Sequence, residues 1–241
     1  MQKKVRNNII KAASITLAVI LVCIGGFLLY VSDYYHADET AQAVAKEGYV
    51  TNTEEGDYVI SPQSGLERPV GVIFYPGAKV ETKAYLPLLS RLREMGVTCF
   101  VMEMPLRFAF FRVDAAEQVI EDNPQIEHWY IAGHSLGGAM ASQYAFDNQD
   151  KLDGLILLGA YPYKEYPVEK TLTIYGSLDT SVAEKLDYTE NVHIIEGGNH
   201  AQFGNYGEQS GDAEATIFAE AQQTITVSYI MTFIMQQSML P

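Results

Sequence analysis

The sequence predicts an α/β fold in which helices cover both faces of a mostly parallel sheet. After about residue 57, short apolar runs rich in β-branched residues alternate with longer segments of helical character. The runs are apolar almost throughout, as expected for parallel strands that are covered on both faces. The intervening segments are long enough for crossover helices, so the three-layer α/β class follows. The expected strands are residues 70–75, 97–102, 128–132, 154–158, 171–175 and 192–195.

Helix signals occur between these strands. Pro87 can open a helix because its missing N–H is not needed in the first turn, and Gly96 can end that helix in a left-handed conformation. Residues 112–122 and 139–146 are expected to form the next helices. Near the C-terminus, Asp212 is expected to cap a helix that packs on the sheet. The apolar stripe of that helix has helical spacing and consists of Phe218, Ala221, Ile225, Tyr229 and Phe233.

An uncharged apolar segment, residues 12–31, precedes the predicted fold. At about 1.5 Å per residue, a helix of this length crosses a hydrocarbon core of about 30 Å. Residues 1–11 are basic and acidic residues follow the segment, so the positive-inside rule predicts a cytoplasmic N-terminus and a domain outside the membrane. Residues 32–56 are polar and acidic and are expected to form a stalk with at most one short helix. Residues 57–241 then form the globular domain.

Two other interpretations of the apolar segment are weaker. A cleaved signal peptide would have an apolar core of roughly 7 to 15 residues, and the nearest Ala-x-Ala, at residues 41–43, lies well downstream. A buried core helix would leave the basic cluster in front of it without a role. The segment is therefore predicted to be a signal anchor in the cell membrane.

Charge and composition exclude several classes of partner. A net charge of −14 argues against nucleic acid, because an acidic surface repels phosphate backbones. No two histidines have metal-ligand spacing, so neither a metal nor another cofactor is expected. Cys23 lies in the apolar segment and Cys99 in an expected strand, and both are interpreted as small hydrophobic residues. A small, neutral substrate fits best.

A candidate nucleophile follows the expected strand at residues 128–132. The sequence Gly-His-Ser-Leu-Gly, residues 133–137, places Ser135 in a sharp turn from strand to helix. The glycines two residues before and after Ser135 let strand and helix approach closely enough to hold a strained turn. The helix N-terminus favours negative charge beside it. The pattern alone is weak, and its strand-turn-helix context is what makes Ser135 the predicted nucleophile.

A serine nucleophile requires a histidine base and an acid that orients it, in the chain order serine, acid, histidine. Asp179 follows the expected strand at 171–175, and His200 follows the one at 192–195. Parallel strands bring their carboxyl ends to one edge of the sheet, so Ser135, Asp179 and His200 are predicted to converge there.

Other titratable residues fit these roles less well. Asp153 precedes a strand and so lies at the opposite edge, and Asp187 falls in a segment with helical character. His134 adjoins the serine and is expected to point away from it, whereas His193 lies inside a strand.

Two backbone N–H groups are needed to hold negative charge on a substrate oxygen. One is expected from Leu136, the residue after the serine, and the other from the loop after the strand at 70–75. Both Gly77 and Ala78 are candidates for the second donor.

These motifs resemble the α/β-hydrolase superfamily, and within it the compact bacterial branch related to dienelactone hydrolases and small carboxylesterases. The resemblance covers roughly residues 57–237. It implies an α/β-hydrolase fold whose triad is Ser135, Asp179 and His200 and whose activity is hydrolysis through an acyl-enzyme. Dienelactone hydrolases use cysteine as nucleophile, so their lactone substrate is not expected. The segments that carry the resemblance are residues 74–80, 133–138, 175–179 and 197–204.

The resemblance and the anchor together imply a membrane-anchored carboxylesterase that acts on small or medium acyl esters. Only residues 161–170 separate two of the late strands, which leaves no room for a large cap domain there, so an open site is expected. One alternative is an acyltransferase that acts on an envelope molecule. Another is a membrane-tethered binding protein that kept the fold without turnover, because one fold hosts many functions.

Overall fold

The computed structural model describes residues 2–237. The chain divides into two compact units, Met1–Tyr34 and Tyr35–Pro241. The first unit consists mainly of one helix, α1 (Gln2–Ser32). Its segment Arg6–Ser32 is long and apolar enough to cross a membrane and contains the segment expected to do so.

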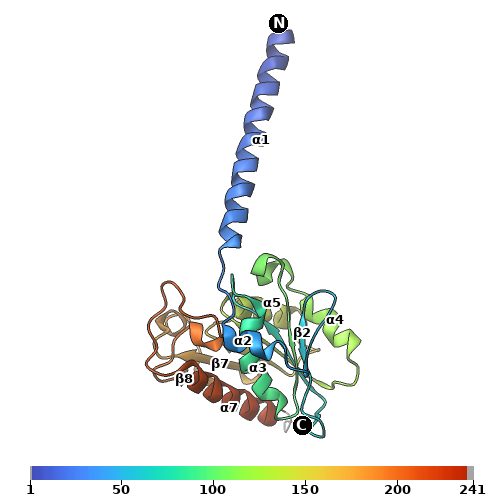
Figure 1. Cartoon of the computed structure of the whole chain (residues 1–241), viewed down its shortest axis with the longest axis vertical. Helices are drawn as coiled ribbons and strands as arrows, with labels where there is room; N and C mark the ends of the chain where they lie inside the picture. Colours follow the sequence, from blue (N-terminus) through green and yellow to red (C-terminus); the bar gives the residue numbers. More distant parts are fainter. Residues whose placement is uncertain (1, 238–241) are drawn as a thin grey trace. The chain divides into compact units, whose positions relative to one another are not determined.

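The second unit is built on an eight-stranded sheet with the order β1-β2-β4-β3-β5-β6-β7-β8 (Figure 1). β1 (Val50–Asn52) pairs antiparallel with β2 (Tyr58–Ile60), which pairs antiparallel with β4. All further pairings are parallel. The six predicted strands are present as β3 (Val70–Tyr75), β4 (Thr98–Val101), β5 (His128–His134), β6 (Gly154–Leu158), β7 (Thr171–Gly176) and β8 (Val192–Ile195).

Helices cover both faces of this sheet, which confirms the three-layer α/β prediction. One core lies between the sheet and α2 (Glu39–Val44), α3 (Leu86–Arg93) and α7 (Ala219–Gln237). A second core lies between the other face and α4 (Ala115–Asp122) and α5 (Leu136–Asp147). The shorter turns are η1 (Thr82–Tyr85), η2 (Pro105–Arg107), η3 (Ala109–Phe111), η4 (Val168–Lys170), α6 (Thr180–Ala183) and η5 (Ala201–Phe203).

Local sequence explains the strands and the first crossover helix. β3, β6 and β7 are buried along their whole length, which is why β3 and β6 are apolar without alternation. Pro87 stands in the first turn of α3, and Gly96, with φ of 85°, follows its end as expected. Between β6 and β7 the only regular element is η4, so no large cap interrupts the fold.

The expected stalk differs from the structure. Residues 35–56 belong to the globular unit: α2 contacts α3 and η1 and adds the fully buried Ala41 to the core, and β1 extends the sheet beside β2. Asp38 caps α2 by accepting the N–H of Ala41 at 2.8 Å. α2 and β1 are short and lie in an acidic segment, so local sequence does not predict them. Their stability comes from tertiary packing rather than from local propensity.

The expected packing stripe of the last helix is wrong at its start and right at its end, where Phe233 is buried and Tyr229 packs against the core. Phe218 and Ile225 are exposed, and Asp212 lies well before the helix, which begins at Ala219. The buried face instead starts with Gln222 and Gln223. A polar side chain can be buried at low cost when its amide is hydrogen-bonded, and both glutamines are.

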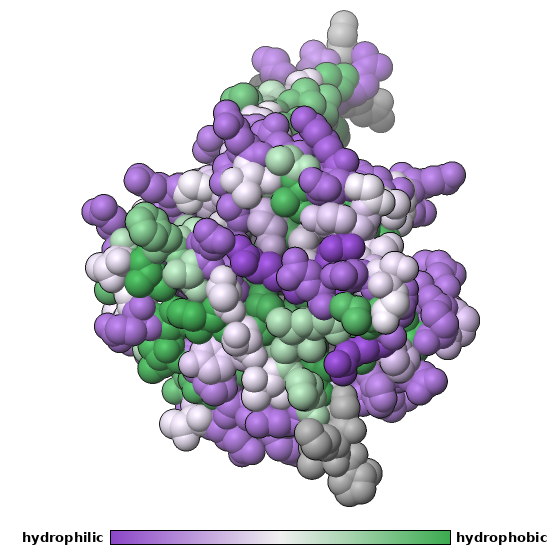
Figure 2. All heavy atoms as spheres, turned by 60° about the horizontal axis from the view of Figure 1, so that its bottom comes forward, coloured by the Kyte–Doolittle hydropathy of each residue, from purple (hydrophilic) through white to green (hydrophobic). Residues whose placement is uncertain are grey.

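Figure 2 shows one face of the molecule, on which hydrophobic side chains lie in several groups among hydrophilic ones. Scattered exposed hydrophobic residues of this kind are normal for a folded protein. Three of the exposed hydrophobic residues, however, share a single loop between β4 and α4: Leu106, Phe110 and Phe111.

Candidate active site

Ser135 lies in a sharp turn between β5 and α5. Its backbone has φ of 53° and ψ of −124°, a conformation that residues with a side chain rarely adopt. The N–H of Ser135 donates to the carbonyl of Leu158 in β6 at 3.1 Å, which ties the turn to the neighbouring strand. Its side chain is half-buried. The backbone therefore has the strained turn that the sequence predicts.

Glycines on both sides of Ser135 make this turn possible. A Cβ atom on Gly137 would lie 2.0 Å from the carbonyl oxygen of Tyr75, and one on Gly133 would lie 2.4 Å from the carbonyl carbon of Gly137. Both contacts are with backbone, which has little freedom to move. The start of α5 is therefore pressed against the ends of β3 and β5.

Replacing Gly137 by alanine is expected to destabilise the protein by about 3 kcal/mol or more, because the new methyl group overlaps the backbone of β3. Urea unfolding of purified protein measures this change. Gly48→Ala is the matched control, because a Cβ atom there meets no atom within 4 Å. Equal stability of the two variants would contradict the close approach.

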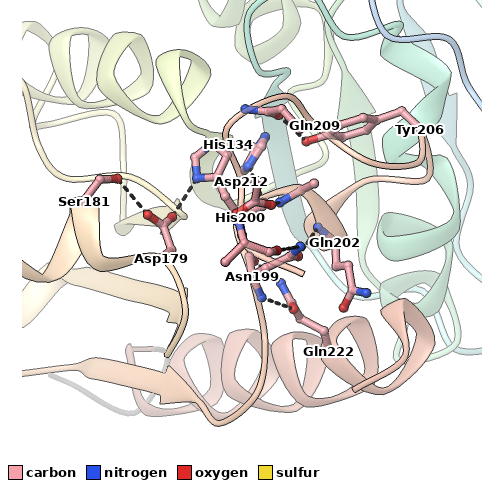
Figure 3. Close-up of polar contacts among 12 residues, drawn as sticks. His134, Asp179, Ser181, Asn199, His200, Gln202, Tyr206, Gln209, Asp212 and Gln222 are labelled. Carbon is pink, nitrogen blue, oxygen red and sulfur yellow. Dashed lines mark hydrogen bonds and ion pairs between the residues drawn. The ribbon is translucent and has the colours of Figure 1, made fainter. Parts of the chain in front are cut away.

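His200 and Asp179 are in direct contact at the carboxyl ends of β8 and β7 (Figure 3). His200 Nδ1 lies 2.6 Å from Asp179 Oδ2. The other oxygen, Asp179 Oδ1, accepts the hydroxyl proton of Ser181 at 2.7 Å. Both side chains are largely buried, with 15% of His200 and 4% of Asp179 exposed.

The electrostatics of Asp179 favour its charged form. Burial by itself would raise the pKa of Asp179, but the hydrogen bonds from His200 and Ser181 outweigh burial, and the net pKa is lowered. A carboxylate in this state can hold the imidazole in one orientation with its Nδ1 protonated.

Ser135 lies close to this pair. Among the hydrogen bonds of the described residues, 2–237, none joins the Ser135 hydroxyl to His200. Leu158 accepts the N–H of Ser135, and a Cβ atom on the next residue, Gly159, would lie 3.0 Å from His200 Nδ1. The imidazole thus lies over the end of β6, beside the serine turn. Serine–histidine hydrogen bonds are often long until a substrate binds.

A chain of buried hydrogen bonds links the loop after β3 to the backbone of His200. The N–H of Gly77 donates to the Tyr85 hydroxyl oxygen at 3.1 Å, and that hydroxyl lies 2.8 Å from His134 Nδ1. His134 Nε2 lies 3.0 Å from the carbonyl oxygen of His200. A carbonyl only accepts, so Nε2 carries the proton and Nδ1 accepts from Tyr85. His134 therefore bridges two parts of the site.

The pKa of His134 is lowered well below its usual value, first because the ring is buried and second because His200 is close. The folded protein thus binds this proton less readily than the unfolded chain. Such a group lowers stability as the pH falls below the unfolded pKa of about 6.5.

We expect the free energy of unfolding of the wild type to fall between pH 7 and pH 5, with His134 contributing a slope of up to about 1.4 kcal/mol per pH unit. His134→Gln should be less stable at pH 7, since it breaks the bridge, but should show a shallower fall. Urea titrations at several pH values measure both slopes. Parallel curves would show that His134 does not stay neutral.

Asp212 is a functional residue that sequence reasoning assigned to a different place. Its Oδ1 accepts the N–H of His200 at 3.2 Å, and its Oδ2 accepts the N–H of Ala201 at 2.7 Å (Figure 3). It thus caps the turn that carries His200 rather than the last helix. No local pattern marks this role, because the partner lies twelve residues earlier.

Gln222 holds the same turn from the other side. Its Oε1 accepts the N–H of Asn199 at 3.0 Å, and its Nε2 donates to the carbonyl of Asn199 at 2.9 Å. The side-chain amide of Asn199 in turn donates to Ala213 at 2.8 Å. The residue before His200 is therefore fixed through its backbone and its side chain.

Asp212→Asn is expected to lower kcat about 10-fold or more, because small displacements of a reacting group are costly in rate. It should also lower the free energy of unfolding by about 1.5–3 kcal/mol, as hydrogen bonds to a charged acceptor are lost. Glu208→Gln, at an exposed position in the same loop, is the control. Activity assays and urea unfolding test the prediction, which fails if the two variants behave alike.

The two main hollows of the surface lie away from Ser135. One of about 540 Å³ is formed largely by residues 201–219, and another of about 480 Å³ lies beside β2 and α4. Ser135 and His200 line neither of them.

The fold and motifs match known proteins. A family model described as the alpha/beta hydrolase family matches residues 71–224. No curated protein sequence matches this chain significantly.

Solved structures with a similar fold include ester hydrolases. A ferulic acid esterase from Streptomyces cinnamoneus is 17% identical, covering 72% of this chain and 68% of its own, with a TM-score of 0.53. Est1E from Butyrivibrio proteoclasticus is 15% identical, covering 78% of this chain and 98% of its own, with a TM-score of 0.53. A monoglyceride lipase from Saccharomyces cerevisiae is 11% identical, covering 79% of this chain and 95% of its own, also with a TM-score of 0.53.

At these identities the solved structures support the fold alone. The family model covers more than half of the chain and includes both the serine turn and the Asp179–His200 pair. The chain therefore belongs to the alpha/beta hydrolase family.

Proposed function

We propose that this protein is a membrane-anchored serine hydrolase that cleaves acyl esters, with Ser135 as nucleophile, His200 as base and Asp179 as the residue that orients the base. The observation that carries the proposal is the 2.6 Å contact between His200 and Asp179 at the sheet edge where the strained turn presents Ser135. The names of the structurally similar proteins, a ferulic acid esterase and a monoglyceride lipase, support an ester as the substrate.

The reaction proceeds in two halves. In the first, Ser135 Oγ attacks the ester carbonyl carbon while its proton passes to His200 Nε2. The bond from that carbon to the alcohol oxygen then breaks, and the alcohol leaves with the proton from His200. In the second half, water attacks the acyl-enzyme, gives a proton to His200, and releases the acid as Ser135 regains its proton. Asp179 stabilises the imidazolium in both halves.

The amides of Leu136 and Ala78 are the best candidates to stabilise the negative oxygen. Leu136 is the first residue of α5, where the N–H groups have no partner within the helix. The N–H of Gly77 already donates to Tyr85, which favours Ala78 over Gly77 as the second donor. Both donor residues are half-buried and so accessible to a substrate.

The anchor is the apolar part of α1. Its length and composition fit a membrane span, and the basic residues before it fit a cytoplasmic N-terminus. The globular unit would then act outside the membrane. A site without a large cap between β6 and β7 fits small or medium acyl groups.

Labelling with a fluorophosphonate probe tests the proposal. The wild-type chain in detergent should be modified, and Ser135→Ala should not. A panel of p-nitrophenyl esters of increasing chain length then measures the preferred acyl group. If the folded wild type is neither labelled nor active on any ester, the chain is a binding protein and the proposal is wrong.

A further inference from the structure

The globular unit begins beside the loop that supplies Ala78. The N–H of its first residue, Tyr35, donates to the carbonyl of Lys79 at 2.7 Å, and the carbonyl of Tyr35 accepts the N–H of Glu81 at 2.9 Å. The Tyr35 hydroxyl accepts the N–H of Ser210 at 3.1 Å. The point where the chain enters the domain is therefore fixed next to the candidate oxyanion loop.

The same loop is bonded to a segment with exposed aromatic residues. The N–H of Lys79 donates to the carbonyl of Arg107 at 3.0 Å. Leu106 and Arg107 both have positive φ, 53° and 63°. Residues other than glycine rarely adopt this conformation, so the backbone here is strained. Strain of this kind persists only where the surroundings hold it, and it often marks functional segments.

This segment, residues 106–111, presents an unusual hydrophobic surface. Leu106, Phe110 and Phe111 are 42%, 46% and 49% exposed, and the rings of Phe110 and Phe111 lie 4.4 Å apart. Phe108 packs beneath them, 5.2 Å from Phe110. Single exposed apolar side chains are normal on a protein surface. A group of them marks a binding site for a protein, a ligand or a membrane. We call these exposed residues, Leu106, Phe110 and Phe111, the aromatic patch.

The aromatic patch also lies beside the helix that follows the serine. η3, which contains Phe110 and Phe111, contacts α5, and α5 begins at the residue after Ser135.

The distance from α1 to this edge is limited by the covalent chain. Only Asp33 and Tyr34 separate Ser32, the end of α1, from Tyr35. Three peptide steps of about 3.8 Å allow at most about 11 Å between the Cα atoms of Ser32 and Tyr35. The interfacial layer on each side of the hydrocarbon core is itself several ångströms thick. With α1 in the membrane as proposed above, a tether this short keeps Tyr35 near the membrane surface.

We propose that the aromatic patch docks into the outer surface of the membrane that holds α1, so that Ser135 acts on acyl esters of membrane amphiphiles that reach it from the lipid phase. The inference rests on the anchor and the triad of the proposed function. Aromatic side chains favour the boundary between headgroups and acyl chains, and their burial there adds to the hold of the anchor. The preferred substrate is then a lipid-borne ester rather than a freely dissolved one.

The experiment uses the full-length chain reconstituted in phosphatidylcholine vesicles. Two double variants each remove two exposed phenyl rings: Phe110→Ser with Phe111→Ser in the patch, and Phe146→Ser with Phe218→Ser as the matched control. Phe146 is 43% and Phe218 86% exposed, so neither double variant opens the core. Each protein is assayed on p-nitrophenyl butyrate in solution and on a fluorogenic butyryl ester of a lipid embedded in the vesicles, so that the acyl group is the same in both.

The patch variant should lose at least 10-fold on the embedded ester and stay within about twofold of wild type on the soluble ester. The control should match wild type on both. Equal rates for the two double variants on the embedded ester would overturn the proposal.

A second measurement does not depend on catalysis. Phe111→Trp and Phe218→Trp are compared for quenching of their fluorescence by spin-labelled lipids in the vesicles, with the wild type as the baseline for the buried Trp129 that all three proteins share. The indole introduced at position 111 should be quenched and the one at position 218 should not, and equal quenching would overturn the docking. If the wild type hydrolyses neither ester, the proposed hydrolase function fails, while the quenching comparison still decides whether the patch meets the membrane.

Discussion

Replacing Ser135 by alanine is expected to lower kcat for ester hydrolysis by about 10⁵- to 10⁶-fold, and adding His200→Ala to that variant is expected to cost almost nothing more. In the proposed mechanism the two residues act as one unit, because the histidine has no proton to accept once the serine hydroxyl is gone. Each single variant should therefore be nearly as inactive as the double variant. Single-turnover and steady-state assays with p-nitrophenyl esters measure the three rates.

The structure offers a reason to expect that these losses are purely chemical. Alanine meets the same backbone strain at φ of 53° as serine does, so Ser135→Ala should leave the free energy of unfolding unchanged. An additive loss, in which the double variant is slower than the wild type by the product of the two single-variant factors, would show that the two residues do not work together.

Asp179→Asn is expected to lower kcat by about 10⁴-fold while KM changes little. An asparagine amide in this place donates to His200 Nδ1 instead of accepting from it, which leaves the imidazole in the wrong tautomer for accepting the serine proton. Ser181→Ala is the control, since it removes the hydrogen bond to the other carboxylate oxygen without changing the contact with His200. The control should lose far less activity.

The same substitution has a pH signature in stability. The pKa of Asp179 is lowered in the folded protein, so its charge stabilises the fold above the unfolded pKa of about 3.9. That contribution is lost as the pH falls through the folded pKa. The stability difference between wild type and Asp179→Asn should therefore be largest near neutral pH and shrink below about pH 4. A difference that does not depend on pH would argue against a charged Asp179.

Sequence alone was sufficient for the central sheet, because strands buried on both faces must be apolar throughout. Ser135, Asp179 and His200 could be nominated because each follows such a strand, and parallel strands end at one edge. The features that the sequence could not predict depend on contacts between distant segments. β1 is three residues long and exists only because β2 pairs with it.

The supports around the triad were missed for the same physical reason. Asp212 looks like a helix cap in the sequence, and only the fold brings it to the N–H of His200. Gln222 looks like a solvent-facing residue, and it becomes a buried one because its amide finds both backbone groups of Asn199. The choice between Gly77 and Ala78 likewise required the hydroxyl of Tyr85, eight residues away from Gly77.

The hydrogen bonds between Gln222 and the backbone of Asn199 affect when the site can form during synthesis of the chain. α7 is the last regular element in the described chain, and it is synthesised after all three proposed triad residues. A nascent chain whose His200 has just left the ribosome still lacks the amide that fixes the turn before that histidine. The proposed catalytic geometry is therefore completed only when α7 folds back onto the sheet.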